Sequence, residues 1–389
     1  MRPRSVAIAS ASTTILALAS TVPRPVQAQI PSGAGAPRTS RASALSVPLR
    51  TPDGQPDLQG TWNTATLTPL ERPDAAKGRL TLTEAEATAI ERAEQARVEQ
   101  RGRPSDPSRV APPVGGDGST GAAGGVGGYN FFWIDRGDSA IVVDGQRRSS
   151  LVVDPVDGKI PQMTPEGTKR AADLRRAAPT SDAAESVETR ERGAYDDVEQ
   201  RPLAERCLIA FGSSSGPPAL PVLYNNTKQI VQTKDVVMIF NEMVHDVRVI
   251  RMNQPHLPSS IRKWLGDSVG RWEGDTLVVD TTNFTDKTRF RGSSDRLHVV
   301  ERFRRADAKT ILYQFTVDDP ATWPRPWTGE YPWVATGEQV FEYACHESNY
   351  SMQGILAGAR LLEVEAAAKG RESSGRTTCF TNRRYRSLA

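Results

Sequence analysis

Short β-branched and aromatic segments separated by turn residues fill the sequence from about residue 205 onward, and this pattern constrains the fold most strongly. It predicts strands near residues 208–211, 229–233, 236–241, 246–251, 276–284, 297–305, 310–318 and 339–345. Gly274-Asp275 predicts a tight hairpin link after Arg271-Trp272. Because consecutive strands with short turns pair antiparallel, we expect a mainly β protein in which an antiparallel meander forms a lipocalin-like barrel or a sandwich.

The first residues have the pattern of a secretory signal peptide. Arg2 and Arg4 precede an apolar run over residues 6–22, and Val26-Gln27-Ala28 fits the small-residue rule for cleavage. An uncleaved anchor is the alternative, but the run is short for a bilayer span. No later stretch is apolar enough to span a membrane. We therefore expect a periplasmic or secreted protein without a stable membrane span after cleavage.

The rest of the first half is predicted to be irregular and to carry a few helices. Residues 29–60 are rich in Pro, Ser, Gly and Ala, which is typical of a flexible arm. Thr83 and Glu86 predict a capping box at the start of a polar surface helix, and Pro165 predicts the start of a second helix. The expected divisions are a signal peptide (1–28), a flexible arm (29–60), an irregular N-terminal region with surface helices (61–204), a β-rich core domain (205–362) and a C-terminal tail (363–389).

The charge balance bears on possible partners. The full chain carries +3, and the predicted signal contributes Arg2, Arg4 and Arg24 with no acidic residue, so the mature chain carries 3 − 3 = 0. Nucleic-acid binding needs a basic surface that neutralises phosphates. We therefore expect no nucleic-acid partner and consider a small molecule instead.

Three cysteines, Cys207, Cys345 and Cys379, are present in the sequence. In an oxidising compartment two of the three are expected to form a disulfide. Their spacing differs from that of a tetrahedral metal site, which uses closely spaced pairs. The spacing alone leaves the choice of pair open.

Several motifs resemble a large family of exported bacterial proteins. The resemblance is dense over residues 205–362 and rests on Tyr224-Asn225-Asn226, Asn241-Glu242-Met243-Val244-His245-Asp246, Pro255-His256-Leu257-Pro258, Trp264-Leu265-Gly266-Asp267-Ser268, Gly270-Arg271-Trp272-Glu273-Gly274-Asp275-Thr276-Leu277, Asp280-Thr281-Thr282-Asn283-Phe284 and Glu342-Tyr343-Ala344-Cys345-His346-Glu347. It implies export and a shared domain but no particular reaction. Cys207 and Cys345 fall in family-like stretches and Cys379 does not, so the resemblance favours a Cys207–Cys345 disulfide.

The four histidines, His245, His256, His298 and His346, all lie in the β-rich half. Their spacing is not the helical spacing of a zinc protease motif, but a sheet brings distant residues side by side. A histidine beside a carboxylate is suited to general acid–base chemistry near neutral pH or to metal binding. The alternative for each histidine is a hydrogen-bonded structural residue. No cofactor is predicted, and a divalent metal is left open.

Four residues are the catalytic candidates. Glu242 and His245 flank the turn between the strands predicted over 236–241 and 246–251, which places them at the mouth of a barrel. Glu301 shares an otherwise apolar strand face, where a carboxylate needs a partner or a raised pKa. The alternative for Glu301 is a structural ion pair with Arg248 or Arg271. Arg271 is the candidate stabiliser of an anion.

Six further residues are candidates for ligand binding: Asp267, Trp272, Asp280, His298, His346 and Glu347. Trp323-Pro324-Arg325-Pro326-Trp327 predicts a rigid aromatic loop that stacks on a ligand or packs the barrel end as a lid. Three functions follow from these patterns. The first is a non-redox hydrolase, lyase or isomerase with His/carboxylate chemistry at a barrel mouth. The alternatives are a non-catalytic periplasmic protein that binds a small, partly apolar ligand, and a structural partner in the cell envelope.

Overall fold

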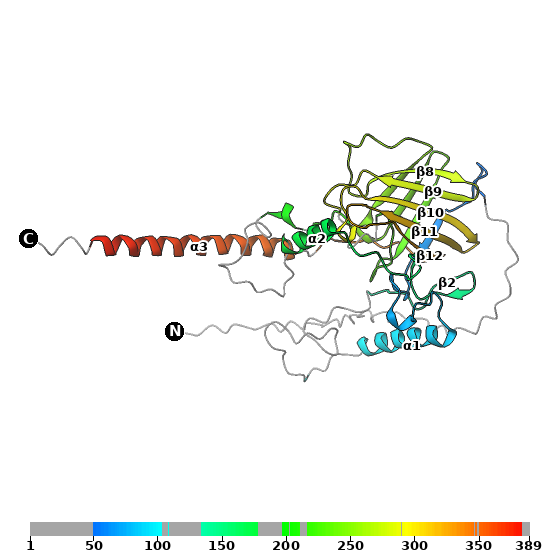
Figure 1. The fold of residues 1–389 in the computed structure, drawn as a ribbon, viewed down its shortest axis with the longest axis horizontal. Helices are drawn as coiled ribbons and strands as arrows, with labels where there is room; N and C mark the ends of the chain where they lie inside the picture. The colour runs from blue at the N-terminus through cyan, green and yellow to red at the C-terminus, as the bar shows by residue number, and fades with distance from the viewer. Residues whose placement is uncertain are drawn as a thin grey trace, which may run out of the picture. The chain divides into compact units, whose positions relative to one another are not determined.

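The computed structural model, shown in Figure 1, describes residues 50–102, 108, 134–177, 197–201, 203–210, 216–288, 290–345, 347 and 350–382. The predicted signal peptide and most of the predicted arm fall on residues 1–49, which lie outside this part of the chain.

A closed mixed β-barrel forms the centre of the described structure. Its nine strands are β1 (Gly60–Asn63), β5 (Thr227–Gln232), β6 (Val236–Asn241), β7 (Val247–Met252), β8 (Asp267–Glu273), β9 (Thr276–Thr282), β10 (His298–Asp307), β11 (Thr310–Asp318) and β12 (Trp327–Ala335). The ring closes because β1 pairs with β5 on one side and with β12 on the other. A short strand, β4 (Val152–Asp154), adds to β12. The prediction of a mainly β barrel is confirmed, and closure decides between barrel and sandwich.

One strand pair departs from an antiparallel meander. β7 and β8 run parallel, with Ile250 opposite Ser268 and Met252 opposite Gly270. Parallel neighbours need a connection that returns the chain to the starting end, and residues 253–266 form it. The predicted hairpin after β8 is present, with Glu273 opposite Thr276 and with Gly274 at a φ of +60° that favours glycine.

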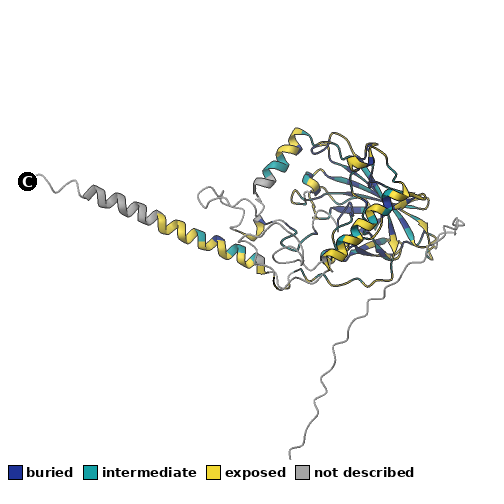
Figure 2. Ribbon diagram, turned by 90° about the horizontal axis from the view of Figure 1, so that it is seen from below, coloured by how far each residue is buried: buried dark blue, intermediate teal, exposed yellow. Residues whose placement is uncertain are grey.

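Strand alternation explains which side chains fill the barrel. On β10 the buried residues Val299, Glu301 and Phe303 alternate with partly exposed ones, and β11 and β12 follow the same period of two. Large aromatic side chains dominate the filling, because Trp62, Tyr313, Phe315, Trp327, Tyr331 and Trp333 are all fully buried. Figure 2 shows the contrast between these dark blue strands and the exposed helix α1.

Two predicted strands are absent from the described residues, and the observed strands β1 and β12 were not predicted. Residues 336–345 contain no strand, and residues 208–210 form bends and irregular backbone. β12 was predicted in part as an aromatic loop, because Pro324, Pro326 and Pro332 interrupt its strand pattern. Trp327 nevertheless begins a strand, and its ring contacts Trp323 edge-to-face at a centroid distance of 6.0 Å.

The described residues outside the barrel include three α-helices. α1 (Glu84–Arg101) begins at the predicted capping box, in which Thr83 Oγ1 accepts a hydrogen bond from Glu86 N and the Glu86 side chain accepts one from Thr83 N. α2 (Pro165–Ala177) begins at the predicted proline. α3 (Tyr350–Asn382) occupies much of the segment that was predicted as a tail. No helix in the described ranges is long and apolar enough to cross a membrane.

The remaining elements are short. They are the strands β2 (Val142–Val143) and β3 (Gln146–Arg147) and the 3-10 turns η1 (Asp74–Ala76), η3 (Val198–Gln200), η5 (Met243–His245) and η6 (Phe290–Gly292). A disulfide joins Cys207 to Cys345, with the Cα atoms 5.9 Å apart, as the family resemblance predicted.

Candidate functional site

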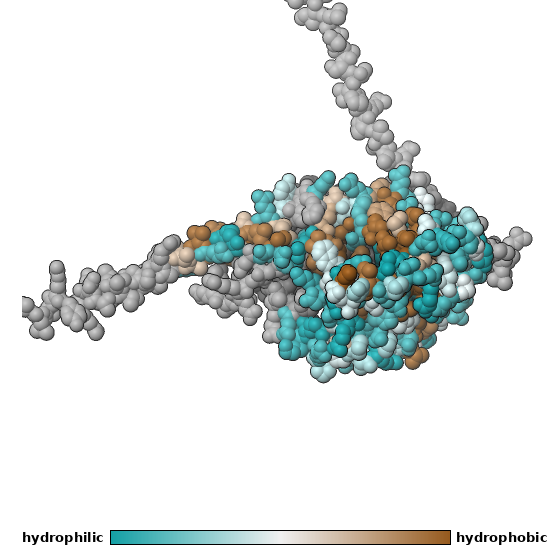
Figure 3. All heavy atoms as spheres, turned by 90° about the horizontal axis from the view of Figure 1, so that it is seen from above, coloured by the Kyte–Doolittle hydropathy of each residue, from teal (hydrophilic) through white to brown (hydrophobic). Residues whose placement is uncertain are grey.

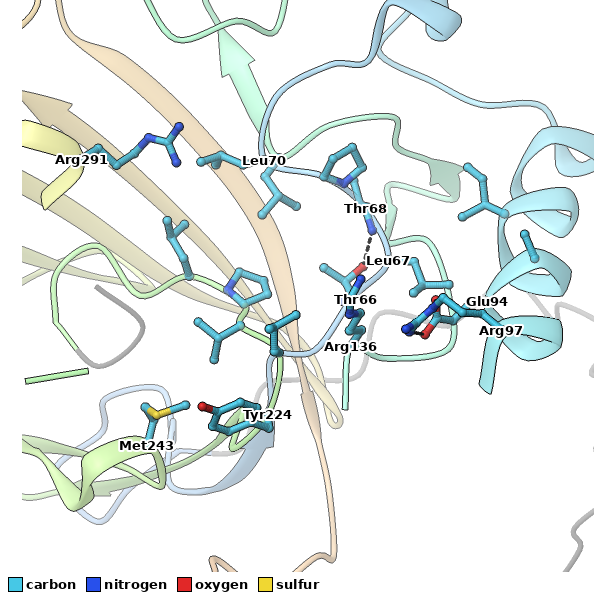
Figure 4. Close-up of a pocket in the computed structure, with 18 residues that line it drawn as sticks. Thr66, Leu67, Thr68, Leu70, Glu94, Arg97, Arg136, Tyr224, Met243 and Arg291 are labelled. Carbon is cyan, nitrogen blue, oxygen red and sulfur yellow. Dashed lines mark hydrogen bonds and ion pairs between the residues drawn. The ribbon is translucent and has the colours of Figure 1, made fainter. Parts of the chain in front are cut away.

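A cleft of about 1000 Å³ lies at the barrel end that carries the turn between β6 and β7. Most of its lining comes from four parts of the chain: residues 66–70 after β1, helix α1, residues 220–224 before β5, and the β6–β7 turn. Arg136, Leu151 and Arg291 complete the lining. In Figure 4, Met243 and Tyr224 lie at one end of the cleft, and Glu94 and Arg97 of α1 lie at the other. This geometry is a barrel-mouth pocket of the size that holds a small molecule.

Apolar side chains form most of the cleft wall, including Leu67, Leu70, Ile90, Leu220, Val222 and Met243. The charged residues of the lining are Glu94, Arg97, Arg136 and Arg291. Glu94 and Arg97 form an ion pair with each other on α1. Arg291 Nη2 lies 3.9 Å from Glu71 Oε2, which is the limit of ion-pair distance. The charged lining therefore carries three arginines against one carboxylate.

Glu242 and His245 stand beside this cleft, because Met243 between them is part of its wall. The buried Glu242 carboxylate accepts hydrogen bonds from Thr227 N at 3.2 Å and Phe341 N at 3.1 Å. The exposed His245 accepts one at Nδ1 from Tyr343 N at 2.9 Å. Both predicted catalytic side chains thus hold the segment around residues 341–343 against the turn.

Glu301 lies inside the barrel and is completely buried. Arg248 donates two hydrogen bonds to its carboxylate, one of them 2.9 Å from Nη1 to Oε1, and Tyr313 Oη donates to Oε1 at 2.7 Å. Arg248 Nε also donates to Ser268 Oγ at 3.1 Å. Of the two interpretations of Glu301, the structural ion pair with Arg248 is therefore the one present.

Lys228 is a buried ionisable residue that sequence reasoning missed. Its Nζ donates to Asn241 Oδ1 at 2.9 Å and lies 5.9 Å from the centroid of the Trp333 ring. Burial, followed by the charge of Arg248, lowers the pKa of Lys228, and the opposing effect of Glu242 and Glu301 leaves it at about 7. The strand was predicted to begin at residue 229, two positions after its observed start at Thr227, so the alternation that places Lys228 on the inner face with Ile230 went unused.

A chain of histidine and aspartate side chains lies where β8, β9 and β10 meet the loop before β8. His256 Nδ1 lies 3.2 Å from Asp267 Oδ2, and His256 Nε2 lies 3.0 Å from Asp280 Oδ1. His298 Nε2 lies 3.1 Å from the same Asp280 oxygen. The two histidine side chains and Asp280 are partly exposed, between 28% and 36%, so solutes reach this chain from solvent. It brings together three predicted binding residues, Asp267, Asp280 and His298.

The two carboxylates of this chain are held in the charged form. Burial raises the pKa of Asp280, but hydrogen bonds from His298 and His256 outweigh burial and leave the pKa lowered. Burial likewise raises the pKa of Asp267. The hydrogen bonds that it accepts from Leu257 N, His256 and Lys263, together with the charge of Arg251, lower the pKa by more, so the net pKa is below the usual value. The hydrogen bond to Asp280 raises the pKa of His298, which burial only partly offsets.

The remaining candidates lie elsewhere. β7 starts at the β6–β7 turn and β8 runs parallel to it, so the β8–β9 hairpin, with Arg271 and Trp272 beside it, is at the opposite end of the barrel. The exposed Arg271 donates to Glu273 Oε1 at 2.6 Å. Glu347 is exposed, and His346 lies outside the described residues. The part of the chain that the structure describes contains no group of three or more His, Cys, Asp or Glu side chains that could hold a metal ion.

Comparisons of the chain with protein-family models, with curated proteins and with solved structures found no match.

Proposed function

We propose that this protein is exported and binds a small, partly apolar anion in the cleft at the barrel mouth. The observation that carries the proposal is the cleft itself, whose volume of about 1000 Å³ suits a drug-sized molecule and whose wall is largely apolar. The Cys207–Cys345 disulfide supports export, because disulfides persist in oxidising compartments.

The charge of the lining supports an anionic ligand. The charged residues of the lining are three arginines and one glutamate, so guanidinium groups outnumber carboxylates around the cleft, although Glu94 pairs with Arg97 and Arg291 lies 3.9 Å from Glu71 Oε2. A guanidinium group binds carboxylate, sulfate or phosphate oxygens through paired hydrogen bonds. An apolar body packed against Leu220 and Met243, with an anionic group near Arg291, matches the composition of the wall.

The test uses native mass spectrometry of the purified protein together with titration of anilinonaphthalene sulfonate, a fluorescent apolar anion. We expect a co-purifying small molecule, and saturable probe binding that Arg291→Gln weakens about tenfold, because a charge-assisted hydrogen bond contributes roughly 1.5–3 kcal/mol. Arg296→Gln is the matched control, since Arg296 is an exposed arginine outside the cleft lining. Probe binding that is unsaturable, or equal in both variants, contradicts the proposal.

A non-redox enzyme with His/carboxylate acid–base chemistry is the second candidate, and the chain from His298 through Asp280 to His256 favours it. A partly exposed imidazole whose pKa a carboxylate raises is suited to move protons near neutral pH. Screening of ester, glycoside and lactone substrates would then show turnover that His298→Ala abolishes without changing the circular dichroism spectrum. Retention of full turnover by His298→Ala removes this assignment.

A further inference from the structure

Helix α3 exposes an apolar stripe along the length over which its side chains are described. Tyr350, Leu361 and Val364 are 76%, 59% and 63% exposed. Figure 3 shows brown, hydrophobic side chains on the surface of this helix. Most helices in proteins are stabilised by packing of an apolar face, so an exposed stripe of this length indicates that something packs against it.

The stripe follows the spacing of a coiled coil. Apolar or small residues recur at alternating intervals of four and three positions, at Tyr350, Gly354, Ala357, Leu361, Val364 and Ala368. These are the a and d positions of successive heptads, with Leu361 at a and Val364 at d. The glycine at 354 has open space around the position of a Cβ atom, and Ala357 and Ala368 are exposed, so the seam is uncovered along its length.

Charges beside the seam complement each other between two copies of the helix. Arg360 occupies a g position and Glu365 occupies the e position of the next heptad. In a parallel, in-register pair these positions face each other across the interface. Arg360 of each copy then lies beside Glu365 of the other copy, which gives two equivalent ion pairs. Within one helix Arg360 pairs with Glu363 at 2.8 Å, but both side chains are more than half exposed, so exchange of this partner costs little.

We propose that α3 docks a second copy of this chain through these six seam positions, as a parallel two-stranded coiled coil. Small residues at Gly354, Ala357 and Ala368 let two helix backbones approach closely, whereas they leave the centre of a three- or four-helix bundle hollow. The disulfide at Cys345 ties the segment just before α3 to Cys207, so the pair would hold two barrels side by side at their helix bases. The proposal is independent of the ligand of the cleft.

Analytical ultracentrifugation of the purified protein over a hundredfold concentration range tests the stoichiometry. We expect a monomer–dimer equilibrium whose dissociation constant rises at least tenfold in Leu361→Asp. Ala366→Asp is the matched control, because it adds the same charge to the same helix at an exposed position outside the seam. A protein that stays monomeric, forms a larger oligomer, or loses association equally in both variants overturns the proposal.

Charge exchange and cross-linking test the orientation. Arg360→Glu and Glu365→Arg should each weaken the dimer about threefold or more, and the double variant should restore it, because the pair is exchanged across the interface. In a Cys379→Ser background, Leu361→Cys should oxidise to a covalent dimer, whereas Ala366→Cys should not. Additive losses in the double variant, or no cross-link at position 361, overturn the parallel arrangement.

Discussion

At the scale of single residues, Lys228 is an ionisable group held almost entirely away from water. Its ammonium group is fully buried in the barrel between Asn241 and the Trp333 ring. Removal from water disfavours the charged form, which explains a pKa of about 7 against an ordinary value of 10.5. The folded chain releases this proton above about pH 7, whereas the unfolded chain holds it up to about pH 10. Above pH 7 the folded barrel therefore contains a neutral amine instead of a buried charge.

The sign of this effect yields a prediction for pH dependence. Between pH 7 and pH 9 the unfolded state binds more protons at Lys228 than the folded state, so the free energy of unfolding rises with pH. The increase is at most about 3 kcal/mol over two pH units. Lys228→Met should remove it, as measured by urea unfolding at pH 7, 8 and 9. Parallel pH profiles for Lys228→Met and the parent chain would contradict the assignment.

Sequence reasoning reached part of this residue-level picture. The apolar neighbours of Glu301 correctly indicated a buried carboxylate in need of a partner, and Arg248 was one of the two partners considered. The predicted strand began at residue 229, so Lys228 fell outside it and its place on the inner face of the barrel was missed. His256 and Asp280 are 24 positions apart, and only the path of the loop before β8 brings them to 3.0 Å.

At the scale of elements, the histidine–aspartate chain fastens the loop between β7 and β8 to the barrel wall. Asp267 on β8 accepts hydrogen bonds from Arg251 on β7 at 2.8 Å and from Leu257 N in the loop at 2.9 Å. His256 extends the contact to Asp280 on β9, and His298 on β10 meets the same oxygen. This set of contacts holds the single parallel strand pair of the described barrel in register.

The stabilising effect of the contact between His298 and Asp280 depends on pH. The folded pKa of His298 is raised by Asp280, so the ion pair stabilises the fold below the unfolded pKa of about 6.5 and is lost as the pH rises through the folded value. The side chain is about one-third exposed, which limits the effect to roughly 0.5–1 kcal/mol.

Thermal unfolding at pH 5.5 and pH 8.5 measures this contribution. His298→Gln should lose stability relative to the parent chain at pH 5.5 and differ less at pH 8.5. His245→Gln serves as the comparison, because His245 is exposed and accepts a hydrogen bond from a backbone amide instead of meeting a carboxylate. An equal loss at both pH values would assign His298 a role in packing alone.

Elements whose pattern is local were the predictable ones. The capping box before α1, the Gly274-Asp275 hairpin and the alternation along β10 and β11 are each visible within about ten residues. β12 was missed because its prolines resemble a loop, although Pro332 occupies a strand position opposite Leu312. The predicted strand over 339–345 is instead a segment held by Glu242, His245 and the disulfide, which are long-range contacts.

At the scale of the whole molecule, closure of the barrel depends on chain segments far apart in sequence. Trp62 on β1 pairs with Lys228 on β5 and with Ala335 on β12, so a four-residue strand joins the two edges of the sheet. No periodic pattern marks so short a strand, and the sequence placed it at the margin of an irregular region. The barrel was predictable from its long strands, whereas its closure and its parallel pair were not.

The buried ion pair crosses the interior of this closed barrel, since Arg248 stands on β7 and Glu301 on β10, which are not neighbouring strands. Removal of one partner leaves the other charge unpaired away from water, so Arg248→Met should lower the free energy of unfolding by about 3–5 kcal/mol. Arg248→Met combined with Glu301→Leu removes both charges and should recover most of this loss, although Tyr313 Oη then lacks its acceptor.

The free energy of unfolding is measured by chemical unfolding. The control is the exposed pair of Arg271 and Glu273, which lies at the other end of the barrel. Arg271→Met removes one of the two arginine partners of Glu273, the other being Arg302, at an exposed site where an ion pair contributes at most about 1 kcal/mol. If Arg248→Met costs no more than Arg271→Met, the carboxylate of Glu301 reaches water or a proton inside the barrel, and the interior is not sealed. If the double variant is as unstable as Arg248→Met, the loss comes from packing in the lumen, since no unpaired charge is then left to explain it.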